Sequence, residues 1–294
     1  MTNSNPPLPP VPAGATSTIV NSIRQASRGS DVDFGLLMAQ AEQESGFNAH
    51  AHASGSSAAG LYQFIDSTWL DMVRRFGGHH GLGDLAQQIT TDSAGRATVA
   101  DPATRQHILA LRNDPALSAA FAGEYTRLNG RALEQALGRP PCNADLYMAH
   151  FLGAGGAATF LKALNRDGGT VAADLMPNAA AANSAVFYDN KSGRPRTISE
   201  IYQSFAERID GAARRLASAD PADEPGASDM TLPGAPLRPQ LAEATTPFRG
   251  PGALMPAPGG PLENWLDIVA LSALKLMARP APTDHLPVRG HRSI

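Results

Sequence analysis

Two glutamates stand two positions apart near the end of a predicted helix, in the stretch "MAQAEQESGF" (residues 38–47). Each residue of an α-helix turns about 100°, so Glu44 extends the apolar face formed by Leu37 and Ala41, whereas Glu42 lies about 200° away from it. A carboxyl group held against apolar neighbours resists ionisation and can keep a proton to donate near neutral pH. The spacing predicts a general acid at Glu44 and a solvated surface residue at Glu42.

The residues after Glu44 predict a binding cleft. Ser45 and Gly46 end the helix, and the Ser45 hydroxyl could hydrogen-bond a nearby carboxylate. A Gly/Ser-rich excursion then returns in a glycine, an aliphatic residue, an aromatic residue and an amide: Gly60, Leu61, Tyr62 and Gln63. A glycine permits close backbone approach, aromatic rings stack on pyranose faces, and amides bind acetamido groups. This combination indicates a cleft for a glycan.

The elements that position these residues are predicted to be helices. Apolar residues recur at helical intervals from Phe34, behind a capping-box pattern that runs from Ser30 to Asp33, and Asp66 stands where it could cap a second run ending at Gly77. Alternating strands are short, although "AGLYQF" could form a hairpin arm. The fold class is therefore mainly α, with a small β-hairpin or loop arm. Further helices are predicted over residues 103–113, 116–137, 143–150, 154–166 and 198–216.

Proline marks the ends of the folded part, because most of the 24 prolines lie outside residues 19–217. One compact domain is predicted over residues 16–217, after a Pro-rich segment over 1–15. It is followed by a Pro/Gly/Ala-rich linker over 218–260, an amphipathic helix over 261–279 and a flexible tail over 280–294. That helix would dock on a partner protein or on the domain itself, or lie at a membrane interface, since it is short and charged for a transmembrane span.

The charge and composition of the chain limit the classes of ligand and partner that we expect. The formal net charge is −3 and charged residues make up 17% of the chain, so no strong basic field attracts nucleic acid. The single cysteine, Cys142, excludes an internal disulfide and a Cys-based zinc site. His79, His80 and Asp84 lie close in sequence, but adjacent histidines point in different directions, and no metal is expected there. The first twenty residues lack the basic start and apolar run of a secretory signal, so export would need another route.

The segment "ESGFNAHAHASGSSAAGLYQF" strongly resembles the Glu-Ser and Gly-Leu-(Met/Tyr)-Gln motifs of soluble lytic transglycosylases, lysozyme-like enzymes that cut bacterial peptidoglycan. The segments "YMAHFLGAGGAATFLKAL" and "FYDNKSGRPRTISEIY" resemble later parts of one branch of that family, so the likeness covers about residues 19–210. The resemblance implies a goose-type-lysozyme-like helical domain over 16–217. It also implies cleavage of the β-1,4 bond between N-acetylmuramic acid and N-acetylglucosamine, without a cofactor.

Carried residue by residue, the resemblance makes Glu44 the single catalytic acid/base and Ser45 its support, and it assigns the groove motif to residues 60–63. Many family members have a Tyr-Asn-Ala-Gly motif where this chain reads His150-Phe151-Leu152-Gly153, so His150 or Tyr147 would substitute for the family's tyrosine.

A later loop is expected to cover one end of the groove with Tyr188, Arg194 and Arg196. There the arginines would meet the stem-peptide or lactyl carboxylates of peptidoglycan, or form ion pairs that pin the loop.

Three functions remain open at this point. A lytic transglycosylase would form a 1,6-anhydromuramoyl end with one carboxylate, whereas a hydrolytic lysozyme on the same fold would need a second, for which Asp66 is the nearest candidate. A peptidoglycan-binding or scaffold protein would keep the groove without turnover. The expected partners are glycan strands and, through residues 261–279, a cell-envelope, flagellar or secretion-machine protein. The expected location is the periplasm or cell envelope, or a phage particle.

Overall fold

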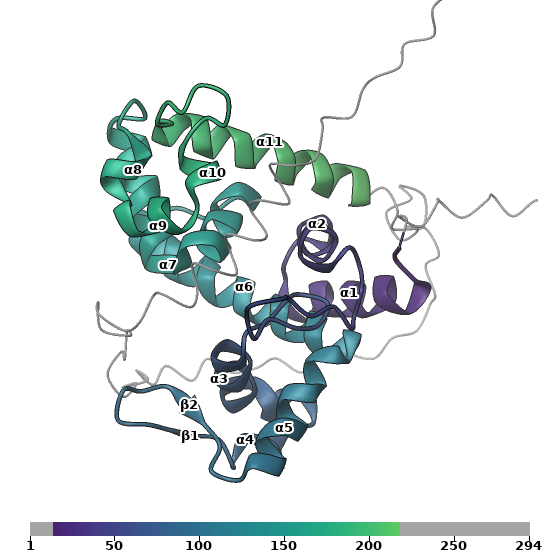
Figure 1. Ribbon diagram of the computed structural model, residues 1–294. Helices are drawn as coiled ribbons and strands as arrows, with labels where there is room; N and C mark the ends of the chain where they lie inside the picture. Colours follow the sequence, from purple (N-terminus) through teal and green to yellow (C-terminus); the bar gives the residue numbers. More distant parts are fainter. Residues whose placement is uncertain (1–13, 218–294) are drawn as a thin grey trace, which may run out of the picture. The chain divides into compact units, whose positions relative to one another are not determined.

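The computed structural model describes residues 14–217, which are mainly helical with one small sheet (Figure 1). The predicted mainly α fold is confirmed. The segments predicted over 218–260, 261–279 and 280–294, and most of 1–15, lie outside the described residues. The described chain divides into two compact units, one of residues 14–128 with 209–217 and one of residues 129–208. Each unit is described by itself below.

The first unit opens with two helices, α1 (Ser17–Ser30) and α2 (Phe34–Ser45). Asp33 caps α2, because its side chain accepts a 2.7 Å hydrogen bond from the Leu36 amide. Ser30 still belongs to α1, where its hydroxyl donates to the Ala26 carbonyl at 2.7 Å. The predicted capping box from Ser30 to Asp33 is therefore wrong, since Asp33 itself occupies the cap position.

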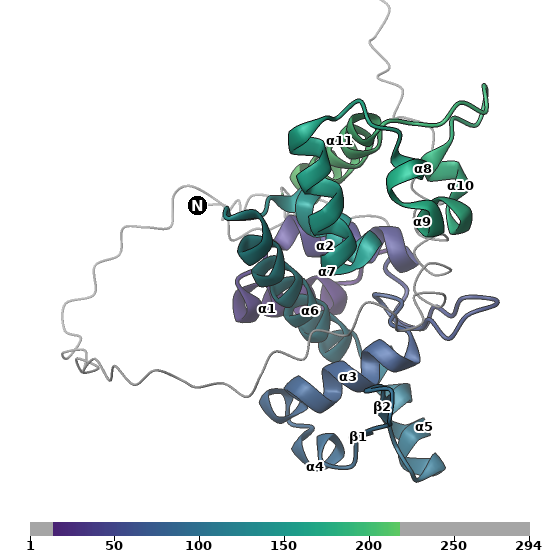
Figure 2. The same cartoon turned by 90° about the vertical axis from the view of Figure 1, so that its left-hand side faces the viewer.

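The remaining elements of the first unit are short, apart from α3 (Figure 2). The sheet pairs two strands antiparallel, with Thr90 opposite Thr98 and Thr91 opposite Ala97. The segment predicted as a hairpin arm, residues 59–64, makes only isolated bridges, so the hairpin of this fold lies at 90–98 instead. In order, the elements are α3 (Asp66–Phe76), η1 (Gly77–His80), α4 (Gly83–Ala86), β1 (Thr90–Thr91), β2 (Ala97–Thr98), α5 (Pro102–Ala110) and η2 (Leu111–Asn113).

Trp69 anchors the core of the first unit. Its side chain is fully buried, and its indole Nε1–H donates to the Ile108 carbonyl at 2.7 Å. The ring meets Phe64 and Phe121 edge to face, with centroids 5.4 and 5.0 Å apart. Trp69 thereby fastens α3 to α5 and to α6 (Pro115–Leu137), which begins in this unit. Phe76, the last residue of α3, is only half-buried and packs against the Arg75 guanidinium.

The second unit contains the end of α6, the long helix α7 (Asn143–Arg166) and the start of α11 (Ile198–Ala217). Three short helices lie between α7 and α11: α8 (Ala172–Leu175), α9 (Pro177–Ala182) and α10 (Ser184–Phe187). Gly153 breaks the regular backbone of α7 with a φ of 69°. The helices predicted over 143–150 and 154–166 are thus the two halves of one kinked helix.

Aromatic rings form the core of the second unit. Phe205 of α11 meets Tyr147 and Phe151 of α7 edge to face, with centroids 5.4 and 5.2 Å apart. Phe187 of α10 stacks on Phe151 at 6.5 Å. All four rings are at most 2% exposed. These contacts fix α10 and α11 against α7 (Figure 1). None of the helices within residues 14–217 has the length and apolarity to cross a membrane.

Candidate active site

Glu44 occupies the last turn of α2, a helix that is buried over most of its surface. Its side chain is 3% exposed, which confirms the predicted burial. The helix ends at Ser45 because the next residue, Gly46, adopts a left-handed conformation with a φ of 61°, and the Gly46 amide donates to the Glu42 carbonyl at 2.9 Å. The sequence thus places a buried carboxyl group next to the point where the chain turns sharply at the end of α2.

Glu42 is not the solvated residue that the sequence predicted. Its carboxylate accepts a 2.7 Å hydrogen bond from Arg215 Nη2, and its side chain is 18% exposed. The reason is that the end of α11 packs closely on α2, where a Cβ on Gly35 would come within 2.5 Å of the Ala213 carbonyl oxygen. Glu42 is therefore a packing contact of α2.

Ser45 joins the end of α2 to the predicted groove motif. Its hydroxyl lies 2.8 Å from the Leu61 carbonyl oxygen and 3.2 Å from that of Ala41, and it donates to these backbone acceptors. The carboxylate partner predicted for this hydroxyl is replaced by a carbonyl. Ser45 supports the site by holding Leu61 next to the turn that follows Glu44.

Gly60 and Gln63 give the motif its shape. Gly60 has a φ of 82°, and a Cβ there would come within 2.1 Å of the Arg112 carbonyl oxygen, so only glycine fits. Gln63 also has a positive φ, of 49°. The Nε2 atom of its side chain donates to the carbonyls of Ala51 at 3.0 Å and Gly60 at 2.8 Å. We call residues 51–64 the arm. Gln63 folds the arm back on itself.

Tyr62 and Leu61 point into the interior. Leu61 is fully buried, and Tyr62 is 6% exposed with its hydroxyl donating to the Leu37 carbonyl at 3.0 Å. Burial raises the pKa of Tyr62 far above its ordinary value, so it stays a neutral donor. These side chains attach the arm to α2, and a contact of the motif with sugar rings stays a prediction.

Arg112 completes the arm from a distant part of the sequence. Its Nη1 donates to the carbonyls of Ser57 at 2.6 Å and Phe64 at 2.9 Å. The same nitrogen lies 2.9 Å from Asp66, which also accepts from Arg105 at 2.7 Å. Burial lowers the pKa of Arg112, against the attraction of Asp66. The sequence analysis missed this residue, because nothing in the local pattern links position 112 to the arm.

Asp66 has neither of the roles considered for it. It is the first residue of α3, behind Ile65 at the cap position, and it makes no cap hydrogen bond. Its carboxylate instead balances two arginines. A carboxylate held in this way is poorly suited to serve as a second catalytic group.

The second unit holds the other candidate residues. Tyr147 is 1% exposed, and its ring centroid lies 5.8 Å from that of the half-buried His150, one turn further along α7. Tyr188 follows α10 and is 37% exposed. The structure thus pairs Tyr147 with His150 and leaves Tyr188 at the surface of its unit.

Ion pairs pin the loop that contains Tyr188, as one of the two interpretations predicted. Arg194 binds Glu200 through two nitrogens, at 2.7 and 3.1 Å, and this contact is the main reason that the pKa of Glu200 falls to about 2. Arg196 lies 4.0 Å from Asp189. Arg194 is therefore committed to the loop.

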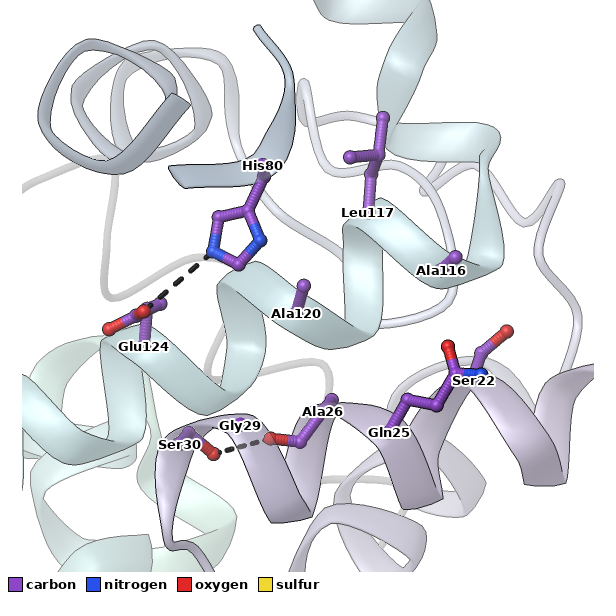
Figure 3. A pocket seen from close by; sticks show the side chains of 10 residues that line it. All are labelled: Ser22, Gln25, Ala26, Gly29, Ser30, His80, Ala116, Leu117, Ala120 and Glu124. Atoms are coloured by element: carbon purple, nitrogen blue, oxygen red, sulfur yellow. Dashed lines mark hydrogen bonds and ion pairs between the residues drawn. The ribbon is translucent and has the colours of Figure 1, made fainter. Parts of the chain in front are cut away.

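A pocket of about 270 Å³ opens between α1, η1 and α6 of the first unit (Figure 3). At one end, His80 Nε2 lies 3.7 Å from Glu124, whose carboxylate also binds Arg127. Glu44 does not line this pocket. Within residues 14–217, no three His, Cys, Asp or Glu side chains come together as a metal site, around His79 or elsewhere.

Part of the first unit matches a known protein family. Residues 21–98 match the family model described as "Transglycosylase SLT domain". The matched segment contains Glu44, Ser45 and the motif at 60–63, whereas Tyr147, His150 and Tyr188 lie beyond it. The mainly helical fold with its small sheet is consistent with a lysozyme-like domain of this kind.

Proposed function

We propose that this protein is a peptidoglycan lytic transglycosylase, because its residues 21–98 match the transglycosylase SLT domain family. The family supports a lytic-transglycosylase-like action on peptidoglycan. The reaction proposed for this chain is cleavage of the β-1,4 bond between N-acetylmuramic acid and N-acetylglucosamine, with formation of a 1,6-anhydromuramoyl end. The burial of Glu44 at the end of α2, beside the arm, is the observation that supports it best.

In the proposed mechanism Glu44 acts twice. Its carboxylic acid first donates a proton to the glycosidic oxygen, so that the C1–O bond breaks and N-acetylglucosamine leaves with a free 4-hydroxyl. The muramic acid ring gains oxocarbenium character, assisted by its own acetamido group. The Glu44 carboxylate then accepts the proton of the C6 hydroxyl as its oxygen attacks C1 and closes the anhydro ring. No water is consumed, and Glu44 ends protonated as it began.

The surroundings of Glu44 support a one-carboxylate mechanism. A glycosidase that uses two carboxylates needs a second one across the cleft, free to act as base or nucleophile. Asp66, the candidate near in sequence, is held by Arg105 and Arg112. The contacts of Ser45 and Tyr62 with backbone carbonyls keep the arm and α2 in fixed register, and such pre-organisation favours proton transfer.

The test compares the full-length wild-type protein with Glu44→Gln on purified peptidoglycan, with mass spectrometry of the soluble fragments. The amide cannot donate the proton, so we expect fragments one water lighter than hydrolysis products from the wild type and none from the variant. Glu42→Gln is the matched control, because it makes the same change two residues away in the same helix and should keep cleavage. Reducing ends would instead indicate a hydrolytic lysozyme, and no fragments from the wild type a binding or scaffold protein.

Peptidoglycan lies outside the cytoplasmic membrane, so we propose the periplasm or cell envelope as the site of action, with glycan strands as the main partner. A cell-envelope, flagellar or secretion-machine protein that binds residues 261–279 is a further proposed partner. Fractionation of cells expressing the full chain, with and without residues 261–279, tests both proposals through the distribution of the protein between compartments.

A further inference from the structure

Phe47, three residues after Glu44, has a backbone conformation that is unusual for an aromatic residue. Its φ is 64°, in the left-handed region that a bulky side chain strongly disfavours. The strain is not relieved by a move of the ring into solvent, because Phe47 is only 2% exposed. A strained residue persists only where the surrounding structure fixes it, and such residues cluster at functional sites. Strain this close to the proposed acid indicates a role in the site.

The amide of Phe47 closes the end of α2 around Glu44. It donates to the Ala41 carbonyl at 3.3 Å, and the Gly46 amide donates to the Glu42 carbonyl at 2.9 Å. Carbonyls in the last turn of a helix lack partners within the helix, so these two hydrogen bonds satisfy them. Glu44 lies midway between residues 41 and 47, inside the ring that the first hydrogen bond closes. This bond therefore restrains the turn that carries the carboxyl group.

Phe47 also stands where the chain leaves α2 for the arm. Directly after it, the Asn48 amide donates to the Ser45 carbonyl at 3.3 Å, and the Ala51 amide donates to the Asn48 carbonyl at 3.2 Å. The Ser45 hydroxyl in turn donates to the Leu61 carbonyl of the arm at 2.8 Å. A change in the backbone at residue 47 would consequently disturb both the last turn of α2 and the start of the arm.

Glycine would adopt the conformation of Phe47 at a lower cost. Gly46, the preceding residue, is also left-handed, with a φ of 61°, and has no side chain to oppose it. At Phe47 the burial of the ring offsets the conformational cost, so the ring holds the backbone in the left-handed state. The chain before α1 packs against the same turn, since a Cβ on Gly14 would come within 2.9 Å of the Gly46 carbonyl oxygen. The turn therefore has little room to move.

We infer that Phe47 is a positioning residue for the proposed reaction, and that its left-handed backbone holds the turn bearing Glu44 in the geometry for proton transfer. The inference rests on the proposed function. Misplacement of a reacting group by about 1 Å can slow a reaction about a hundredfold. Because Phe47 is buried, it acts through Glu44, and its loss should lower kcat while KM changes little.

The test compares Phe47→Gly with Phe47→Ala in the full chain, on soluble uncrosslinked glycan strands. Both variants remove the ring, but only glycine adopts the left-handed conformation freely. We expect kcat to be about fivefold to thirtyfold lower for Phe47→Ala than for Phe47→Gly, the factor that corresponds to the cost of a left-handed residue with a Cβ. Equal kcat values, a higher kcat for Phe47→Ala or a difference in KM alone would overturn the inference.

A second pair keeps the test decisive if loss of the ring unfolds the protein. Phe47→Leu and Phe47→Ile bury side chains of equal size, but isoleucine is branched at Cβ and disfavours the left-handed region more strongly. We expect the lower kcat for Phe47→Ile, measured where circular dichroism shows both variants to be folded. The same kcat for both would count against a role of the backbone conformation.

Asp31 supplies the matched control at the end of another helix. It is also left-handed, with a φ of 57°, and its amide donates to the Ser27 carbonyl at the end of α1. Asp31→Gly and Asp31→Ala should differ in stability in the same direction as the Phe47 pair, with kcat unchanged. A kcat that differs as much in this pair as in the Phe47 pair would show that global stability governs turnover, and the inference would fail.

Hydrogen exchange separates this inference from the proposed function, because it needs no substrate. The amides of residues 46 and 47 exchange only when their bonds to the carbonyls of α2 open. We expect this exchange to be about fivefold to thirtyfold faster in Phe47→Ala than in Phe47→Gly. That order, together with the order in kcat, supports the inference even if the product proves hydrolytic. Equal exchange overturns it even if the anhydro product is found.

Discussion

Replacing Gly60 with alanine tests whether the arm is held by contact with Arg112. The added methyl group meets two obstacles. The left-handed φ of 82° costs a residue with a Cβ about 1–2 kcal/mol, and the contact of 2.1 Å with the Arg112 carbonyl oxygen forces backbone apart, for which overpacking costs about 1–3 kcal/mol more. We expect the free energy of unfolding to fall by about 2–5 kcal/mol.

Gly55→Ala is the matched control that measures the conformational cost of the left-handed φ alone. Gly55 also has a positive φ, of 98°, but a Cβ there would meet nothing within 4 Å, so only the conformational cost of about 1–2 kcal/mol applies. Urea unfolding of both variants, followed by circular dichroism, measures the difference. Peptidoglycan digestion at a temperature where both are folded should show the larger loss for Gly60→Ala, because the displaced arm moves Leu61 away from Ser45. Equal losses of stability would refute the argument that Arg112 sets the position of the arm.

Two further predictions concern hydrogen bonds described by the structure. Ser45→Ala removes the 2.8 Å hydrogen bond to the Leu61 carbonyl. It should lower the free energy of unfolding by about 1 kcal/mol, measured by urea unfolding, and slow cleavage several-fold, measured by fragment release. Unchanged cleavage would show that this hydrogen bond does not support the site. Asp145 is fully buried, and although burial raises its pKa, hydrogen bonds from Arg139, the Cys142 amide and Tyr202 hold the pKa below the ordinary value. A carboxylate whose pKa is lowered in the folded state stabilises the fold when the pH is above its unfolded-state pKa of about 3.9. This stabilisation is lost as the pH falls through the folded-state pKa. Asp145→Asn should therefore cost about 2 kcal/mol at pH 7 and progressively less as the pH falls below about 3.9, and a cost that does not depend on pH would contradict this.

The sequence predicted the helices where apolar spacing is long and regular. This spacing predicts α2, α3 and both halves of α7. The break in α7 falls at Gly153, a glycine between two periodic stretches. The short helices α8 to α10 span too few residues for a period to show. The hairpin at 90–98 had a local signal, since Asp92 and Gly95 form a turn between β-branched residues.

The candidate site was predictable in its residues and much less so in their contacts. The burial of Glu44 follows from its place on the apolar face, and the family motif locates Ser45 and Gly60. Hydrogen-bond partners depend on tertiary packing, so the sequence could not tell that Asp66 would meet Arg112 or that Arg215 would reach Glu42. Glu42 and Asp66 were misassigned because their arginine partners lie far along the chain.

The contacts of the Arg112 guanidinium also determine how far the chain can be shortened without losing the arm. The family match ends at residue 98, yet the carbonyls of Ser57 and Phe64 inside it take their donor from Arg112, and the Trp69 indole takes its acceptor from Ile108. A chain shortened to the matched segment would keep every motif residue and lose the groups that shape the arm. The matched segment and the stretch that shapes the arm are therefore different parts of the protein, and grafting of this domain has to include α5 and η2 along with the glutamate.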